Sequence, residues 1–252
     1  MVNKKGQLAI FIILALAIIV VVVLIFINRG SFDITITPQT PVEEIINCIQ
    51  EVGEQGVDIL NSQGGSLNPE NYYLYQGNKI EYLCYTHENY ERCVMQKPLL
   101  KQNYETELET YMEEGVNNCL TSSKESLVSK GYTVTFKQPE ISVDLVPNNI
   151  LIEVDSDLEI RKDKTESYKV IKTDINSNIY SLVIIASSIS NWDARYGDSE
   201  SMNYMMYYPS LRVEKKVQSD GTTVYILTEK VSEDKFMFAS RSVALPAELG
   251  RI

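Results

Sequence analysis

The chain has 252 residues, with 23 Lys and Arg against 34 Asp and Glu, and its formal net charge is −11 at pH 7. This acidic balance argues against a nucleic-acid partner, because little positive charge is left over to displace phosphate counterions. The length allows one sizeable domain or two small ones.

Residues 8–27 contain no charged or strongly polar side chain. A helix of this length spans about 30 Å, the thickness of a bilayer's hydrocarbon core. Lys4 and Lys5 precede the run and only Arg29 follows it closely, so the basic flank is expected to stay in the cytoplasm. The sequence therefore predicts a single-pass protein of the cell membrane that contacts the lipid bilayer through residues 8–27 and exports its C-terminal part.

The four residues 4–7, Lys-Lys-Gly-Gln, lead directly into this apolar run. The arrangement resembles the archaeal class III signal peptide of type IV pilin-like and archaellin-like proteins. That resemblance implies cleavage after Gly6 and a mature chain that begins at Gln7; the alternative is an uncleaved signal anchor. The fifth mature position would be Phe11, where bacterial-type pilins carry Glu.

The wider layout is also similar to that of single-pass surface proteins of archaea. It combines the Lys-Gly-Gln start with a cysteine-bearing helix at Cys48, the segment Gln63-Gly64-Gly65 and a strand-rich second half. The resemblance implies a location and no chemistry.

Beyond the apolar run, residues 31–41 are rich in Thr and Pro and are expected to form an extended stalk. Thr40 and Pro41 then open a helix, since Pro suits the first helical position and Glu43 and Glu44 follow in the first turn. Its apolar residues recur at helical spacing until residues 63–65. A second helix is expected from about Tyr104 to Lys130, with an apolar stripe that includes Cys119 and with its glutamates mainly on or near the other face.

From Tyr132 the apolar period changes to two, which predicts antiparallel strands at 133–136, 141–145 and 150–161. A helix is expected at 179–196, although its β-branched residues leave a strand open, and residues 197–208 are expected to form a loop. The last strands are predicted at 211–218, 222–229 and 236–244, with Asp220-Gly221 as a tight turn.

The predicted fold class is α+β, with an N-terminal transmembrane helix followed by an exported domain whose helices pack on antiparallel sheet. We expect residues 1–30 to form the cytoplasmic tip and membrane helix and residues 31–41 the stalk. Residues 42–131 are expected to be a helical, disulfide-stapled part, and residues 132–252 a mostly antiparallel β part with one helix.

Four cysteines in an exported domain meet an oxidising compartment and tend to pair. Of the three possible pairings we favour Cys48 with Cys119 and Cys84 with Cys93. A zinc site formed by Cys84, His87, Glu88 and Cys93 is the alternative, but the ligand spacing is irregular. His87 is the single histidine of the chain, which excludes H-E-x-x-H sites, and it is expected to be a solvated loop residue.

The acidic series Glu153, Asp155, Asp157 and Glu159 alternates with apolar residues. It suits either a calcium or acid–base site or, as we prefer, the solvated face of a strand. No catalytic residue, metal site or cofactor is therefore assigned. Sixteen tyrosines are more informative, because tyrosine is favoured at contact surfaces, and Tyr204, Tyr207 and Tyr208 are candidate interaction residues.

Three function classes follow. The preferred one is a membrane-anchored structural or adhesive surface protein, including a pilin-like subunit that assembles with like subunits or another surface protein. The second is an anchored binding module for a peptide, glycan or partner protein. An exported hydrolase that uses Asp155 and Asp157 has the least support, and we expect the protein not to be an enzyme.

Overall fold

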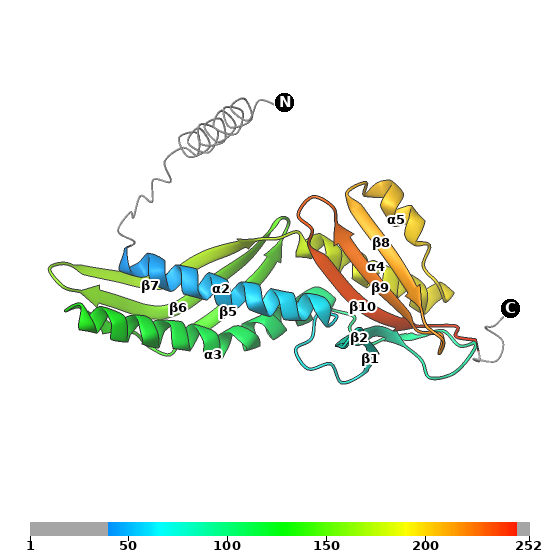
Figure 1. The fold of residues 1–252 in the computed structure, drawn as a ribbon, viewed down its shortest axis with the longest axis horizontal. Coiled ribbons are helices and arrows are strands. Elements are labelled where there is room, and N and C mark those ends of the chain that lie inside the picture. Colours follow the sequence, from blue (N-terminus) through cyan, green and yellow to red (C-terminus); the bar gives the residue numbers. More distant parts are fainter. Residues whose placement is uncertain (1–39, 246–252) are drawn as a thin grey trace, which may run out of the picture. The chain divides into compact units, whose positions relative to one another are not determined.

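The computed structural model describes residues 40–245, and Figure 1 shows how their helices and strands are arranged. The predicted membrane segment at 8–27, most of the predicted stalk and the candidate processing residues Gly6 and Gln7 lie outside this range. Within residues 40–245, none of the helices combines the length and the apolar character needed to span a bilayer.

Two long helices, α2 (Pro41–Ser62) and α3 (Leu100–Ser129), lie side by side in Figure 1. The start of α2 follows the predicted signals: Thr40 is its N-cap, Pro41 is its first residue, and the Glu43 carboxylate accepts the Thr40 N–H at 2.8 Å. The other helix begins at Leu100, four residues before the predicted start. Both helices are therefore close to their predicted positions.

Contact between α2 and α3 is unusually close at two glycines. A Cβ atom on Gly56 would lie 2.6 Å from Leu108 Cδ1, and one on Gly115 would lie 2.5 Å from Val52 Cγ1. The disulfide Cys48–Cys119 joins the same two helices, with its Cα atoms 5.8 Å apart. The predicted pairing of these cysteines is confirmed.

A four-stranded antiparallel sheet covers one side of this helix pair. Its strands are β4 (Thr133–Thr135), β5 (Glu140–Val146), β6 (Asn149–Arg161) and β7 (Thr165–Asn176). The central strand is β6, with β7 along one edge and β5 and β4 one after the other along the opposite edge. The sequence predicted β4, β5 and β6 but not β7, because only Ile171 and Ile175 of that twelve-residue edge strand are buried.

The free edge of β5 is covered by carboxylates of α3. Glu109 accepts the Val143 N–H at 2.9 Å, and Glu105 accepts the Leu145 N–H at 2.8 Å. Four residues of a helix rise about 6 Å, which is nearly the length of two residues in a strand. The spacing of the two glutamates on α3 therefore matches the spacing of the two N–H groups on β5. The sequence predicted these glutamates mainly on or near the outer face of α3; instead they are half-buried against the sheet.

A six-stranded sheet contains strands from both predicted parts of the exported chain. Its strands run in the order β1, β2, β10, β9, β8, with the short β3 also paired to β2. Their bounds are β1 (Tyr72–Tyr75), β2 (Asn78–Tyr85), β3 (Val94–Met95), β8 (Leu211–Val217), β9 (Thr223–Glu229) and β10 (Lys235–Arg241). The β2–β10 pair is parallel, and the other pairs are antiparallel.

Strands β1 to β3 correct the expectation that residues 42–131 are helical. Residues 80–84 of β2 are all buried, so this strand shows no alternation of apolar and polar residues. Strands covered on both faces lose that alternation, and a short run of this kind is difficult to recognise in a sequence. Because β2 pairs with β10, the two predicted parts share one sheet.

Helix α4 (Ile179–Tyr196) packs on the six-stranded sheet and confirms the helix predicted at those residues. The segment 197–208, predicted to be a loop, contains a further helix, α5 (Ser201–Tyr207). Seven residues give less than two helical turns, and α5 buries none of its own residues, so it leaves no apolar period in the sequence.

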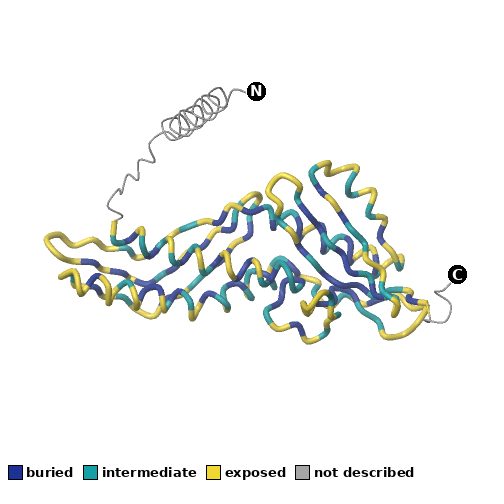
Figure 2. The backbone as a smooth tube through the Cα atoms, viewed as in Figure 1, coloured by how far each residue is buried: buried dark blue, intermediate teal, exposed yellow. Residues whose placement is uncertain are grey.

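One continuous hydrophobic core reaches from the α2–α3 pair to both sheets, and Figure 2 shows its buried stretches along the facing elements. Residues 40–245 thus form an α+β structure that is rich in antiparallel sheet, as predicted.

The close contact at Gly115 predicts the effect of a substitution. Gly115→Ala should lower the free energy of unfolding by about 1 to 3 kcal/mol, because the new methyl group would lie 2.5 and 3.1 Å from the two Val52 methyl groups and the packing would have to shift. Urea denaturation of the oxidised full-length chain, followed by circular dichroism, measures this.

In a Val52→Ala background the same change should be neutral, or stabilising by up to about 1 kcal/mol. The overlap with the Val52 methyl groups is then absent, and only the higher helix propensity of Ala over Gly remains. Equal losses in both backgrounds would show that the helices do not touch here.

Candidate functional site

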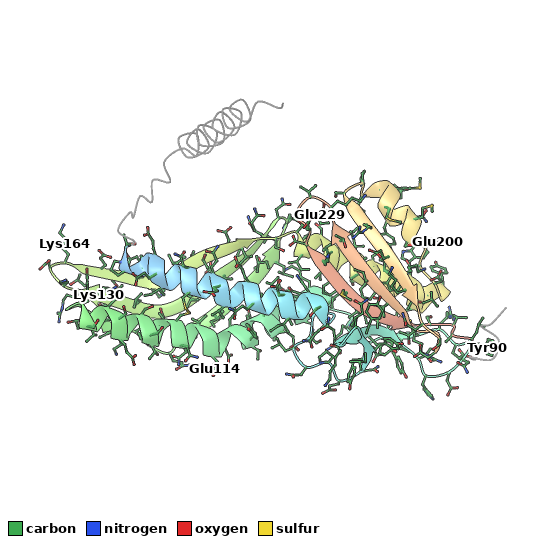
Figure 3. All side chains as sticks on the ribbon, viewed as in Figure 1. Tyr90, Glu114, Lys130, Lys164, Glu200 and Glu229 are labelled. Carbon is green, nitrogen blue, oxygen red and sulfur yellow. A yellow bond between two sulfur atoms is a disulfide. The ribbon has the colours of Figure 1, made fainter. Side chains whose placement is uncertain are left out.

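Two of the three predicted interaction residues meet residues of α4 at a surface groove. Tyr204 and Tyr207 of α5 and Trp192 and Tyr196 of α4 line a hollow of about 440 Å³ that we call the aromatic groove. Tyr208, the third predicted residue, is exposed just after α5 but does not line the groove. Glu200, labelled in Figure 3, marks the connection between the two helices.

The aromatic side chains of the groove are largely exposed to solvent. Trp192 and Tyr196 stack on each other, with ring centroids 4.7 Å apart and an interplanar angle of 30°. Their exposed fractions are 49% and 64%, and that of Tyr207 is 82%. The Tyr204 and Ser188 hydroxyls are 2.8 Å apart and hydrogen-bonded, which fixes α5 against α4.

Helical geometry explains why Trp192 and Tyr196 form a pair. They are four residues apart and therefore neighbours on the surface of α4. Their spacing from Leu182 and Ile189 also fits one helical face, but the buried stripe of α4 continues through Asp193 instead. The two aromatic residues lie just beside that stripe, at its exposed border.

All other groove residues can form hydrogen bonds. They are Ser188, Asp198, Ser199, Glu200 and Asn203. The groove thus combines aromatic rings with hydroxyl, carboxylate and carboxamide groups. Among the described residues that line it, none is aliphatic and none is basic.

A second hollow lies on the other side of the turn that ends α4. It has a volume of about 700 Å³, and we call it the Asp193 pocket. Asp193, Tyr225 and Ser240 form its buried part, and Val217, Val243 and Leu245 are exposed at its border. Tyr196 and Asp198 line both hollows, so the turn around Gly197 forms a shared wall.

Asp193 is a buried acid with an unusual titration. Its side chain accepts a hydrogen bond from the Tyr225 hydroxyl at 3.2 Å, and the residue is only 2% exposed. Burial raises the pKa of Asp193 to about 6, and the negative charge of Asp198 adds to this rise. The rise in the pKa of Asp193 is partly offset by Ser240, Tyr225 and Lys215. In turn, burial and the charge of Asp193 raise the pKa of Tyr225.

A disulfide-closed loop holds the end of β10 at this pocket. Cys84 and Cys93 are bonded, with Cα atoms 5.4 Å apart, which confirms their predicted pairing. The Arg241 guanidinium donates to the Thr86 carbonyl at 2.6 Å, and the Val243 N–H donates to the Glu91 carbonyl at 2.7 Å.

Ser242 connects the same loop to the helix that carries Asp193. Its hydroxyl accepts the Cys93 N–H at 3.1 Å and donates to the Asp193 carbonyl at 2.9 Å. The Cys84–Cys93 loop therefore positions the pocket wall. Since both cysteines are oxidised and His87 is exposed beside Glu88, the alternative zinc site is wrong.

The acidic series of β6 lies on the solvated face that the sequence predicted. Lys137 Nζ lies 3.0 Å from Asp155 and 3.3 Å from Asp157, and Lys172 pairs with Glu153. Across residues 40–245, no three His, Cys, Asp or Glu side chains are grouped as a metal site requires. This series is best explained as exposed charge balanced by lysines.

Sequence reasoning missed Asp193, although the sequence contained a signal for it. Asp193 lies four residues after Ile189, on the stripe that Leu182 and Ile189 define, and an acid on a buried stripe is rare unless it has a specific role. The partners Tyr225 and Ser240 come from β9 and β10 and could not be assigned without the sheet.

Comparisons with protein-family models, curated proteins and solved structures find no match to this chain.

The raised pKa of Asp193 predicts how stability depends on pH. Because the folded chain favours the protonated acid, this group contributes stability below its ordinary pKa of 3.8 that is lost as the pH rises through about 6. The loss amounts to about 3 kcal/mol. Asp193→Asn should therefore be more stable than the wild type at pH 7, by about 2 to 3 kcal/mol, and this advantage should disappear near pH 4.

Urea unfolding of both full-length proteins between pH 4 and 7 measures this difference, in which titrating groups that do not interact with Asp193 cancel. Parallel stability curves for the two proteins would contradict a buried, ionised Asp193.

Proposed function

We propose that this protein is a membrane-anchored adhesive surface protein that binds a neutral glycan in the aromatic groove. The observation that carries the proposal is the cluster of exposed aromatic rings on α4 and α5. Exposed apolar surface of this kind usually marks a binding site, because covering it removes unfavourable contact with water. Trp192 and Tyr196 form a stacked, exposed pair of rings on this surface.

The composition of the groove favours a sugar over an apolar peptide. A pocket for an aliphatic side chain is usually lined by aliphatic residues, and the groove has none. A sugar ring has apolar C–H faces that stack on aromatic rings and hydroxyl groups around its rim. Asp198, Glu200 and Asn203 provide acceptors, and in the case of Asn203 also donors, for those hydroxyl groups.

The charges of the groove favour a neutral glycan over an acidic one. Asp198 and Glu200 line it, and no basic side chain is among its described lining residues. Lys215 lies nearby, but its ammonium group is bonded to Asp198 and to the Ser199 carbonyl. A uronic or sialic acid would place a further negative charge beside these carboxylates, which is unfavourable in a partly desolvated site.

Two further observations support the surface location. The apolar run at 8–27 with Lys4 and Lys5 before it suits an anchor whose C-terminal part is exported. The disulfides Cys48–Cys119 and Cys84–Cys93 suit an oxidising exterior. A pilin-like subunit is the filament form of this proposal, and it depends on cleavage between Gly6 and Gln7.

The glycan proposal predicts a selective loss of binding. Trp192→Ala and Tyr207→Ala should each weaken binding to neutral glycans at least tenfold, because each removes a stacking surface that is exposed and contributes little to the core. A printed array of neutral, sialylated and uronic-acid glycans, probed with the detergent-solubilised full-length chain, measures this.

Tyr72→Ala is the matched control, since Tyr72 is a half-exposed aromatic residue on β1, away from the groove. A preference for acidic glycans, no glycan binding at all, or wild-type binding by Trp192→Ala would each refute the proposal.

The anchoring proposal predicts which parts of the protein are accessible on intact cells. Added protease should remove the part beyond residue 40, and its four cysteines should resist alkylation until they are reduced. Mass spectrometry of the N terminus then separates the two forms: a chain that begins at Gln7 supports the filament form, and one that begins at Met1 or Val2 supports the permanent anchor. A protected C-terminal part with free thiols would contradict both.

A further inference from the structure

The Asp193 pocket contains a carboxylate without a counter-ion. Buried acids are usually paired with a cation, because desolvation of an isolated charge is very unfavourable. Among the described residues that line this pocket, none is Lys or Arg. The nearby ammonium group of Lys215 donates to Asp198 and, at 2.6 Å, to the Ser199 carbonyl.

A second buried polar group in the same pocket also lacks a partner. Ser240 is 2% exposed and lines the pocket, and its hydroxyl forms no hydrogen bond with any of the described residues. It lies near enough to Asp193 to favour the ionised carboxyl, but the two groups do not meet the geometry of a hydrogen bond. A buried hydroxyl of this kind needs an explanation, and a ligand that donates a hydrogen bond provides one.

The pocket border is held in a strained conformation. Val243 has a φ angle of +47°, which is rare for a β-branched residue. Its N–H donates a hydrogen bond to the Glu91 carbonyl. Such strain is maintained only where the surrounding structure enforces it, and it is frequent at functional sites. Here the carbonyl that accepts the Val243 N–H belongs to the Cys84–Cys93 loop.

We propose that the Asp193 pocket binds a small organic cation, a primary ammonium group on an apolar body, with the Asp193 carboxylate as its counter-ion. The ammonium group donates to Asp193 and to the Ser240 hydroxyl. The apolar body contacts Val217, Val243 and Leu245 at the border. A volume of about 700 Å³ is in the range of small-molecule sites, and the pocket is separate from the aromatic groove apart from the shared wall.

The pocket suits an organic cation better than a metal ion. Calcium requires six to eight oxygen ligands and zinc usually four ligands of the nitrogen, sulfur or carboxylate type. Asp193 is the one carboxylate of the pocket that is not bonded to a lysine, and the described residues hold no metal-binding group of three. One carboxylate, one hydroxyl and an apolar border match an ammonium ion with three N–H donors.

Binding of such a cation should depend on the ionisation of Asp193. The titratable or charged groups that face Asp193 are Tyr225 on β9, Lys215 on β8 and Asp198 in the turn after α4. Burial raises the pKa of Asp193 to about 6, so the carboxylate is mostly ionised at pH 7 and mostly protonated at pH 5. The affinity should therefore fall about tenfold between pH 7 and pH 5.

Isothermal titration calorimetry with the full-length chain in a mild detergent tests the proposal. The probe is 2-phenylethylammonium, and the comparison ligands are the neutral 2-phenylethanol and the anion 3-phenylpropionate. We expect the ammonium probe to bind at least tenfold more tightly than the alcohol at pH 7, and the anion not to bind.

Asp193→Asn should remove both the preference for the ammonium probe and the pH dependence while the chain stays folded by circular dichroism. The matched control is Asp163→Asn, which removes one exposed charge in the turn between β6 and β7 and should leave binding unchanged. Trp192→Ala should also leave it unchanged, which separates this site from the glycan groove. Equal affinity for amine and alcohol, or a preference that persists in Asp193→Asn, would overturn the proposal.

Discussion

The close packing of α2 against α3 is the constraint on which the rest of the structure depends. At Gly56 and Gly115 the two helices leave no room for a side chain, and the Cys48–Cys119 bond holds them at that separation. Because of this fixed distance, α3 brings Glu105 and Glu109 within hydrogen-bonding distance of β5, and α2 reaches both β7 and β10. The helix pair thus sets the position of both sheets.

Local patterns in the sequence predicted much of this fold. The Thr40-Pro41 start of α2 and the alternation in β6 are statements about neighbouring residues, and both are observed. The pairing of β2 with β10 brings together residues more than 150 positions apart, and no local pattern encodes it. The short helix α5 was missed for a different reason, since it buries none of its own residues.

In the candidate site, too, local sequence patterns indicate some residues, and only the packing of distant elements identifies the others. Tyr204 and Tyr207 were recognisable because they lie in a tyrosine-rich segment, whereas their neighbours Trp192 and Tyr196 share the helical spacing of the buried residues Leu182 and Ile189. Only the packing of α4 decides that its buried stripe continues through Asp193 and leaves the two aromatic rings outside. A shift of one position around the helix axis reverses the roles of these side chains, and periodicity alone does not resolve such a shift.

The two hollows bring together, in one small region, several features that lower stability. Asp193 is buried without a cation, Ser240 is buried without a hydrogen bond, and the large apolar ring system of Trp192 is half-exposed to water. Each feature destabilises the free chain relative to a simpler alternative, as is common where a protein binds other molecules. The disulfide-closed loop beside them provides rigidity in the same region.

The carboxylates of α3 along β5 have a consequence for how copies of this chain meet one another. An open strand edge invites a strand from a neighbouring copy, which leads to irregular fibres. Glu105 and Glu109 already occupy two N–H groups of this edge, so an incoming backbone would have to displace two charged acceptors. On the opposite edge, β7 exposes Lys169 and Lys172, and lysines on an edge strand discourage the same contact. The β5 and β7 edges of this sheet thus both resist strand-to-strand polymerisation.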